Sequence, residues 1–315
     1  MNTHRMVMMT GLFTAVVLAT AAAMALSSEP MGLPGMEAGE LLRCMDQSSA
    51  TVRTGRLLVR FEIANPKVQP PSITTIEYEL AFDGVRVREE ERAHWVYPGG
   101  QAEEGSSEVL TVFDGERVLQ VRPPDLSSAR VAAPADLREL ERYVGLGAAD
   151  ALIKWPLRAA VQHQDAIGSY VQTWCDEPLQ VAGQQRVGEL SCYLIEVPPA
   201  VRDGISHLKQ YLWVAPDKGC AVAKYQFNTP DGRVVNEVQE WMEPLPGFHL
   251  PKVATRTGYV QEKGGGEKIA IVGRSEVLSA QFNIALPDSL FHVDLPKDAT
   301  VTPFDAEPLL AGRGG

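Results

Sequence analysis

An alternating apolar run, an Asp-Gly pair and a second alternating run occur three times in this chain of 315 residues. The three pairs are Asp83-Gly84, Asp114-Gly115 and Asp231-Gly232. Asp-Gly between alternating runs is a strong signal for a tight β-hairpin, because both turn positions need a positive φ angle. The pattern therefore predicts an antiparallel sheet that is built from sequential hairpins.

The first hairpin has a register that follows from its turn. A two-residue turn at Asp83-Gly84 predicts that Phe82 pairs with Val85 and that Leu80 pairs with Val87. Alternation then places two sets of side chains on opposite faces. The apolar set is Ile76, Tyr78, Leu80, Phe82, Val85 and Val87, and the charged set is Glu77, Glu79, Arg86 and Arg88. A sheet with one apolar face and one solvated face is predicted.

Other alternating runs predict further strands, and one amphipathic helix precedes them. The strands are expected at 55–63, 109–113, 118–121, 177–187, 192–197, 210–215, 221–227, 234–242, 250–261 and 267–278. The helix is expected at 36–49, with one apolar stripe made of Ala38, Leu41, Leu42, Met45 and Ser49. We expect this helix to pack on the sheet.

Residues 134–162 interrupt the strands with a helical pattern. Pro134 is a favourable first residue for a helix, while Gly145, Gly147 and Pro156 break the pattern inside the segment. The apolar residues of the insert are Leu137, Leu140, Leu152 and Trp155. Short helices of this kind must cover something apolar, either as a movable lid or as a fixed plug on the sheet.

The N-terminus has the features of an export signal. Residues 7–26 are almost wholly apolar, and Ala23-Met24-Ala25 fits the small-x-small cleavage rule. We therefore expect a signal peptide at 1–25, a linker at 26–35, one domain at 36–302 and a disordered tail at 303–315. The expected location is the periplasm; an uncleaved membrane anchor at 7–26 is the alternative.

Charge and cysteine content narrow the function classes. The formal net charge is −11, from 40 acidic and 29 basic residues, and no basic block occurs, which argues against nucleic acid as a partner. The four cysteines are Cys44, Cys175, Cys192 and Cys220. In a simple meander one strand separates Cys192 from Cys220, which places their Cα atoms ~9–10 Å apart, too far for a disulfide. The pairing stays open.

The chain offers little that predicts catalysis. Its six histidines lack metal-ligand spacing with cysteine or carboxylate, and no Gly-x-Ser-x-Gly nucleophile elbow occurs. Glu89-Glu90-Glu91 is interpreted as a solvated strand end, because adjacent strand residues point to opposite faces and cannot converge on a cation. We therefore predict a binding protein with no catalytic residue, no metal and no cofactor.

The order of these elements resembles the LolA-like periplasmic lipoprotein carriers. Three segments carry the likeness most clearly: residues 108–115 followed by 118–123 resemble the family's strand-Asp-Gly-strand-Pro signature, residues 247–251 its Gly-x-x-x-Pro strand entry, and residues 291–301 its C-terminal signature. The likeness is spread over residues 36–302. Two departures are that Asp83-Gly84 replaces the family's Arg-Pro, so no arginine latch carries over, and that Asp298 replaces a glycine.

The resemblance implies a mainly β fold, a half-open antiparallel β-barrel whose concave apolar face is covered by short lid helices. It implies a carrier or chaperone that binds lipoprotein acyl chains, or another lipid, and meets membrane-bound donor and acceptor proteins. An envelope-stress sensory domain of the RseB type is the alternative. The residues expected to line the apolar face are Leu57, Val59, Phe61, Tyr78, Leu80, Phe82, Tyr211, Trp213, Tyr225 and Phe227. For the last four, plain core packing is the competing interpretation.

Overall fold

The computed structural model describes residues 35–66, 71–84, 86–97, 103–133, 151–154, 157, 171, 178–202, 205–262 and 264–304. The chain divides after Leu33 into two units, and every described residue belongs to the second unit. The expected signal peptide, nearly all of the expected linker and residues 305–315 therefore lie outside the described ranges.

Strands make up most of the described chain. The α-helices are α2 (Ala38–Ser49) and α4 (Ala151–Lys154), and the short 3-10 helices are η2 (Pro216–Lys218) and η3 (Asp288–Phe291). The strands of the first half are β1 (Thr54–Asn65), β2 (Ser72–Asp83), β3 (Arg86–Tyr97), β4 (Glu103–Phe113), β5 (Val118–Arg122) and β6 (Asp125–Ala132). The later strands are β7 (Gln180–Val187), β8 (Leu190–Val197), β9 (Ala200–Arg202), β10 (Ile205–His207), β11 (Gln210–Ala215), β12 (Ala221–Thr229), β13 (Gly232–Leu245), β14 (Phe248–Gln261), β15 (Glu267–Phe282) and β16 (Thr300–Pro303).

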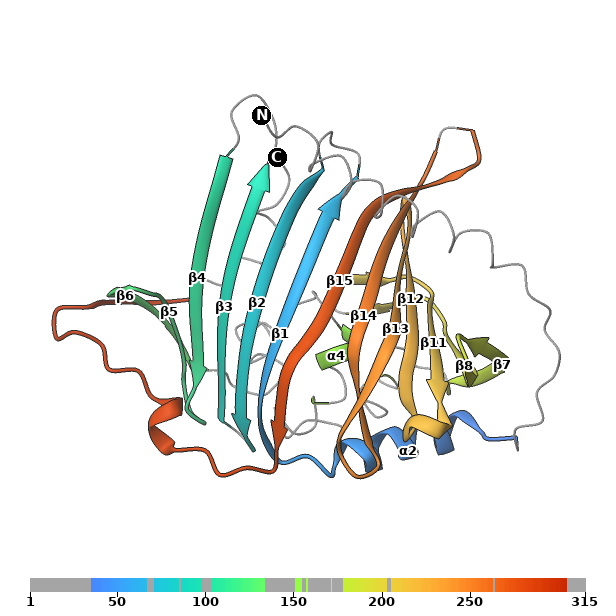
Figure 1. Cartoon of the computed structure of the whole chain (residues 1–315), viewed down its shortest axis with the longest axis horizontal. Coiled ribbons are helices and arrows are strands. Elements are labelled where there is room, and N and C mark those ends of the chain that lie inside the picture. Colours follow the sequence, from blue (N-terminus) through green and yellow to red (C-terminus); the bar gives the residue numbers. More distant parts are fainter. Residues whose placement is uncertain are drawn as a thin grey trace, which may run out of the picture. The chain divides into compact units, whose positions relative to one another are not determined.

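Fourteen strands form one sheet in the order β16-β6-β5-β4-β3-β2-β1-β15-β14-β13-β12-β11-β8-β7 (Figure 1). The pairs are antiparallel except β16 with β6. The sheet starts at β16 and ends at β7 without closing on itself. The predicted fold class, a mainly β chain with an open antiparallel sheet and short helices, is confirmed.

The first hairpin differs from its predicted register by two residues. Asp83 pairs with Arg86 and Phe82 pairs with Val87, so Asp83 belongs to the strand and not to the turn. Gly84 has φ +62°, and the carboxylate of Asp83 forms an ion pair with Arg86 across the strand ends. That ion pair keeps Asp83 in the strand, where the sequence placed it in the turn. A shift of two residues leaves the paired residues of β2 and β3 on their predicted faces; Val85 lies outside the described residues.

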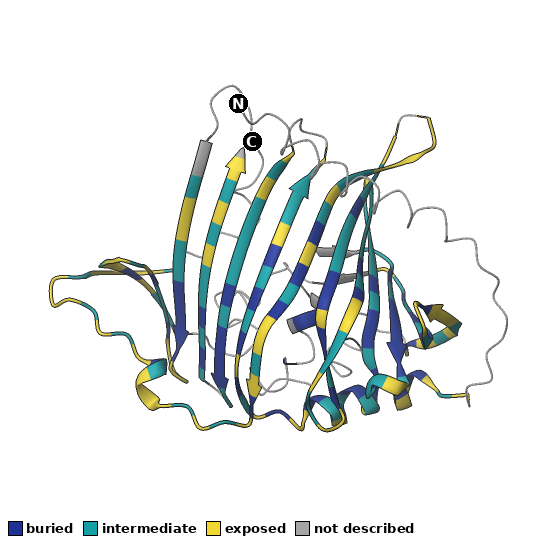
Figure 2. Cartoon of the chain, in the orientation of Figure 1, coloured by how far each residue is buried: buried dark blue, intermediate teal, exposed yellow. Residues whose placement is uncertain are grey.

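Burial alternates along the central strands, as Figure 2 shows for β1. Its buried residues Leu57, Val59 and Phe61 lie on the same face as Leu80 and Phe82 of β2, since directly opposed residues share a face. We call this the inner face and its reverse the outer face. The inner-face cluster of buried apolar residues draws on β1 to β5, β14 and β15, and also contains Ile153 and Leu157 of the helical insert.

The outer face carries a row of charges that crosses five adjacent strands. From β15 to β4 the directly opposed residues are Glu276, Arg60, Glu77, Arg92 and Glu108. Arg60 lies 2.8 Å from Glu77, and Arg92 lies 3.4 Å from Glu108. Opposite charges that are directly across from each other stabilise an antiparallel strand pair modestly, so this row supports the observed register. Its charged side chains also favour a solvated outer face.

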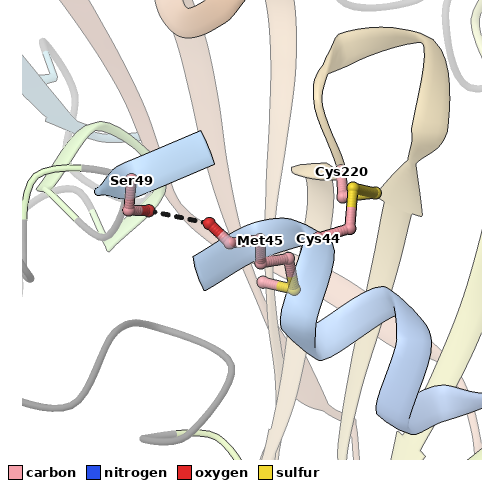
Figure 3. The surroundings of a disulfide bond; sticks show 4 residues. All are labelled: Cys44, Met45, Ser49 and Cys220. Carbon is pink, nitrogen blue, oxygen red and sulfur yellow. Dashed lines mark hydrogen bonds between the residues drawn. A yellow bond between two sulfur atoms is a disulfide. The ribbon is translucent and has the colours of Figure 1, made fainter. Parts of the chain in front are cut away.

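Helix α2 packs at one end of the strands, beside the turn that joins β11 to β12 (Figure 1). Its buried stripe is the predicted one. Cys44 of the helix forms a disulfide with Cys220, whose Cα atom lies 5.7 Å away (Figure 3). The sequence left the pairing open, and the bond joins the helix to the sheet across 176 positions.

Two strands were not predicted. The first is β6, which lies between the expected strand at 118–121 and the expected helical insert at 134–162. The second is β16, which ends at Pro303, so that this residue and Phe304 belong to the folded part and not to the expected tail. Arg130 of β6 lies 5.1 Å from the centre of the Phe304 ring. Parallel pairing of β16 with β6 depends on a long return of the chain, which local patterns cannot indicate.

Candidate functional site

The inner face brings together six of the ten residues that the sequence proposed for a ligand face. All six are buried, and they come from two adjacent strands: Leu57, Val59, Phe61, Tyr78, Leu80 and Phe82. Phe82 also contacts Phe282 of β15, with 6.3 Å between their ring centres. These residues therefore form a continuous apolar floor in the middle of the sheet.

Tyr225 and Phe227 lie farther along the same face. Tyr225 is directly opposite Asn236 of β13, which is opposite Arg256 of β14, and that residue is opposite Gly273 on the inner face of β15. The rings of Tyr225 and Phe227 are 5.5 Å apart. The expected placement of these two residues with the floor of β1 and β2 thus follows from the register.

The prediction that Tyr211 and Trp213 share this face is wrong. Trp213 is directly opposite Lys224, and Tyr211 is opposite Gln226, so both point to the outer face. There Trp213 donates a hydrogen bond from Nε1 to Oε1 of Gln185, at 2.8 Å. Alternation within each strand is a reliable guide, but the phase between two strands depends on the turn that joins them. The turn here contains η2 and a register shift after Trp213, and neither is visible in the sequence pattern.

The helical insert reaches the inner face at α4. Leu152 and Ile153 are fully buried, and the helix packs against β14, β12 and β13. Leu157 is buried in the same cluster as Ile153. The other expected lid residues, Leu137, Leu140 and Trp155, lie outside the described residues, as do the breaks at Gly145, Gly147 and Pro156.

A cavity of about 340 Å³ opens on the inner face where β11 and β12 meet. Its lining combines apolar and uncharged polar residues: Leu208, Gln210, Tyr225, Phe227, Asn228, Thr229 and Pro230. The hydroxyl of Tyr225 donates a hydrogen bond to Oε1 of Gln210, diagonally across the strand pair. The volume lies at the lower end of the ~300–1,000 Å³ that small-molecule sites commonly have.

Buried polar side chains also face inward, and the sequence interpretation missed them. Five of the buried polar residues project from the inner face: Glu89, Thr111, Gln210, Asn236 and Ser275. A signal for two of them is present in the sequence, because Gln210 alternates in phase with Leu212, and Asn236 with Val234 and Val238. A polar residue in the apolar phase of a strand is the pattern that could have found them.

Glu89 corrects a specific prediction. The run Glu89-Glu90-Glu91 was interpreted as a solvated strand end, but Glu89 is only 6% exposed and lies between Leu80 and Thr111 on the inner face. Strand β3 continues to Tyr97 and pairs with β2 and β4 on both sides, so the run lies inside a strand and not at its end. Glu90 points outward and accepts from Arg92 and Arg88.

A second cavity, of about 300 Å³, lies on the outer face of the strands next to the sheet edge. Val112, Leu119 and Val131 line one side of it, and the segment 291–295 after η3 lines the other. The same segment covers a small apolar cluster that is centred on Phe291. This cavity is separated from the inner face by the sheet itself.

Metal binding and thiol reactivity depend on the titratable side chains of the described residues. Within the described ranges no group of three or more His, Cys, Asp or Glu residues is arranged to hold a metal ion. Cys192 is fully buried, and burial raises the pKa of its thiol to about 12, so it stays protonated at neutral pH. Among the described helices, none has the length and apolar character that a bilayer span requires.

Comparisons with known proteins give structural matches alone. No family model matches the sequence, and no curated protein matches it. A LolA superfamily protein, NE2245 from Nitrosomonas europaea, matches over 82% of this chain and 99% of its own, with 14% identity and a TM-score of 0.43.

Two further solved structures match over a similar extent. A DUF1329 family protein from Desulfovibrio piger matches over 81% of this chain and 95% of its own, with 11% identity and a TM-score of 0.45. A Vibrio parahaemolyticus domain described as a putative outer membrane lipoprotein-sorting protein matches over 81% of this chain and 97% of its own, also with 11% identity and a TM-score of 0.45. Each of these three matches has a TM-score below 0.5 and an identity below 15%.

Proposed function

We propose that this protein is a periplasmic carrier that binds the acyl chains of a lipoprotein, or another lipid, on its inner face. The observation that carries the proposal is that an apolar floor and an open cavity lie on one face of the sheet. The floor includes Leu57 and Leu80, and the cavity beside Tyr225 and Phe227 opens on the same face. An elongated apolar ligand needs a surface of this kind, because its affinity comes from the apolar area that it removes from water.

The disulfide supports the proposed location. Disulfides form and persist in oxidising compartments such as the bacterial periplasm, and they are rare in the cytosol. The bond between Cys44 and Cys220 joins the helix that follows the expected export signal to the sheet. This fits a chain that folds after export.

The helical insert serves in this proposal as a lid. Ile153 shares an apolar cluster with Leu57, and burying one such side chain is worth about 1.5–3 kcal/mol. A closed lid therefore predominates without ligand, and the ligand's own burial offsets its opening. Hydrogen exchange of the amides of 151–154, compared with those of 193–197, tests this. Faster exchange at α4 on addition of an acylated peptide is expected, whereas unchanged protection would show a fixed plug.

Acyl binding is tested with a fluorescent fatty acyl probe and two matched variants. Phe227→Glu places a charge in the cavity wall at a half-buried position and is expected to abolish binding. Tyr211→Glu changes a half-buried aromatic residue of the partner strand on the outer face, and is expected to leave binding unchanged. Circular dichroism establishes that both variants are folded. Equal binding by wild type and Phe227→Glu would remove the cavity from the site.

A further inference from the structure

The cavity between β11 and β12 contains a buried amide whose donors are unused. Gln210 is only 8% exposed, and its Oε1 accepts a hydrogen bond from Tyr225. Its Nε2 donates to no acceptor within the part of the chain that the structure describes. The amide nitrogen thus has two N–H groups and belongs to the lining of the cavity.

A second buried amide lies beside the first. Asn236 is only 4% exposed and stands directly opposite Tyr225 on the inner face. Among the described residues its side chain makes no hydrogen bond to the protein. Gln210, Tyr225 and Asn236 therefore form a row of uncharged hydrogen-bonding groups on three adjacent strands.

A ligand that fills the cavity takes the N–H groups of Gln210 out of water, and a donor that then makes no hydrogen bond loses its hydration without compensation. A ligand atom that accepts a hydrogen bond removes this cost. A charged head is disfavoured, because the described residues of the cavity lining include no charged side chain to offset the loss of its hydration.

We propose that this cavity binds the neutral carbonyl of an acylated ligand, the ester or amide oxygen next to the acyl chain, with Gln210 as the donor. The inference rests on the proposed acyl binding and adds the chemical class of the group that the site selects. In this arrangement the carbonyl end lies at Gln210 and Tyr225, and the acyl chain lies along the inner face of the neighbouring strands. Arg256 of β14 is directly opposite Asn236 and continues this row.

The test compares three probes that share a dodecyl-length chain and differ in the head group. N-methyldodecanamide presents a neutral carbonyl, dodecanoate at about pH 8 presents an anion, and dodecyltrimethylammonium presents a cation. Calorimetry on the wild-type protein is expected to give an affinity for the amide at least about tenfold higher than for either charged probe.

Three variants test which residue causes the preference for the neutral amide probe. Gln210→Leu is expected to lower the affinity for N-methyldodecanamide about tenfold, because one hydrogen bond from the Gln210 amide is lost. The affinity for dodecyltrimethylammonium is expected to stay unchanged. Asn236→Leu distinguishes the neighbouring amide and is expected to have a smaller effect of the same sign. Gln239→Leu is the matched control, since Gln239 is an exposed glutamine of β13 outside the cavity.

The possible results separate the two proposals. If Gln210→Leu keeps the full preference for the amide, or if dodecanoate binds most tightly, carbonyl selection at this cavity is overturned while acyl binding stands. The second result would point to Arg256 as the residue that meets the head group. If the wild-type protein binds none of the three probes, acyl binding fails, and carbonyl selection fails with it.

Discussion

The guanidinium carbon of Arg86 lies 4.7 Å from the centre of the Phe291 ring, so the hairpin of β2 and β3 holds the segment after β15 in place. The same guanidinium pairs with Asp83 of its own hairpin and with Asp288 of η3. These hydrogen bonds, that to Asp83 first, raise the pKa of Arg86 above its ordinary value. One side chain thus joins two parts of the chain that are about two hundred positions apart.

Arg86→Ala is expected to loosen this attachment. Stacking on Phe291 and the two ion pairs are lost together, and a cost of about 1–2 kcal/mol in the free energy of unfolding follows from ordinary values for such contacts. Chemical denaturation measures the cost, and hydrogen exchange at 288–291 should rise. Arg56→Ala, which breaks the exposed pair with Glu79, is the control and should change stability by less than about 0.5 kcal/mol. Equal effects of both variants would contradict the role given to Arg86.

Removal of the disulfide is expected to lower stability by about 2–4 kcal/mol, because the unfolded chain regains the freedom of a long loop. The double variant Cys44→Ser/Cys220→Ser, compared with the wild-type protein by urea denaturation, measures this. Cys192→Ala is the matched control for the loss of a cysteine, since Cys192 is not disulfide-bonded. A midpoint that the double variant shares with the wild type would show that the bond adds nothing to the fold.

Trp213 provides a test of the face assignment. Because it lies on the outer face, its fluorescence should not respond to an acyl probe, whereas a tryptophan introduced by Phe227→Trp in the cavity should respond. The indole of Trp213 bonds to Gln185, so Trp213→Phe is expected to destabilise the protein by about 1 kcal/mol without reducing acyl affinity. A loss of acyl binding in Trp213→Phe would contradict the outer-face assignment and show that Trp213 contributes to the ligand site.

His249 makes stability depend on pH. Burial, followed by the nearby charge of Lys218, lowers its pKa below the ordinary value in the folded state. The unfolded chain therefore binds a proton more readily, and stability falls as the pH drops through the ordinary histidine pKa of about 6.5. His249→Gln should have a smaller decrease in melting temperature between about pH 7.5 and pH 5.5 than the wild-type protein. Identical pH profiles would exclude His249 as the source.

The hairpins and the faces of single strands could be predicted because they depend on neighbouring residues. The buried stripe of α2 and the inward phase of Leu57, Val59 and Phe61 follow from periodicity alone. The phase between strands could not be predicted where a turn or bulge intervenes, as between Trp213 and Tyr225. The partner of Cys44 also stayed open, because its distance from Cys220 depends on where the whole sheet places the turn after β11.

Of the ten residues predicted for one apolar face, Tyr211 and Trp213 lie on the other face, and the inward polar residues of the sheet were not predicted. The sequence pattern assigns apolar residues to the inner face and polar residues to the outer face. Gln210 and Asn236 are polar but lie on the inner face, so this pattern does not identify them. Their burial results from the neighbouring strands and from the insert that packs against β12 and β13. Information of that kind is not contained in any one segment.

The bond between Cys44 and Cys220 also has a topological consequence. It encloses every residue from 45 to 219, including β1 to β11 and the complete insert, in one covalent ring. A protease that cuts this ring once opens it but releases no piece, so the nicked chain stays a single molecule until a reductant is added. The helical insert can therefore be cleaved while both flanking halves of the sheet remain attached, and a gel would separate them only after reduction.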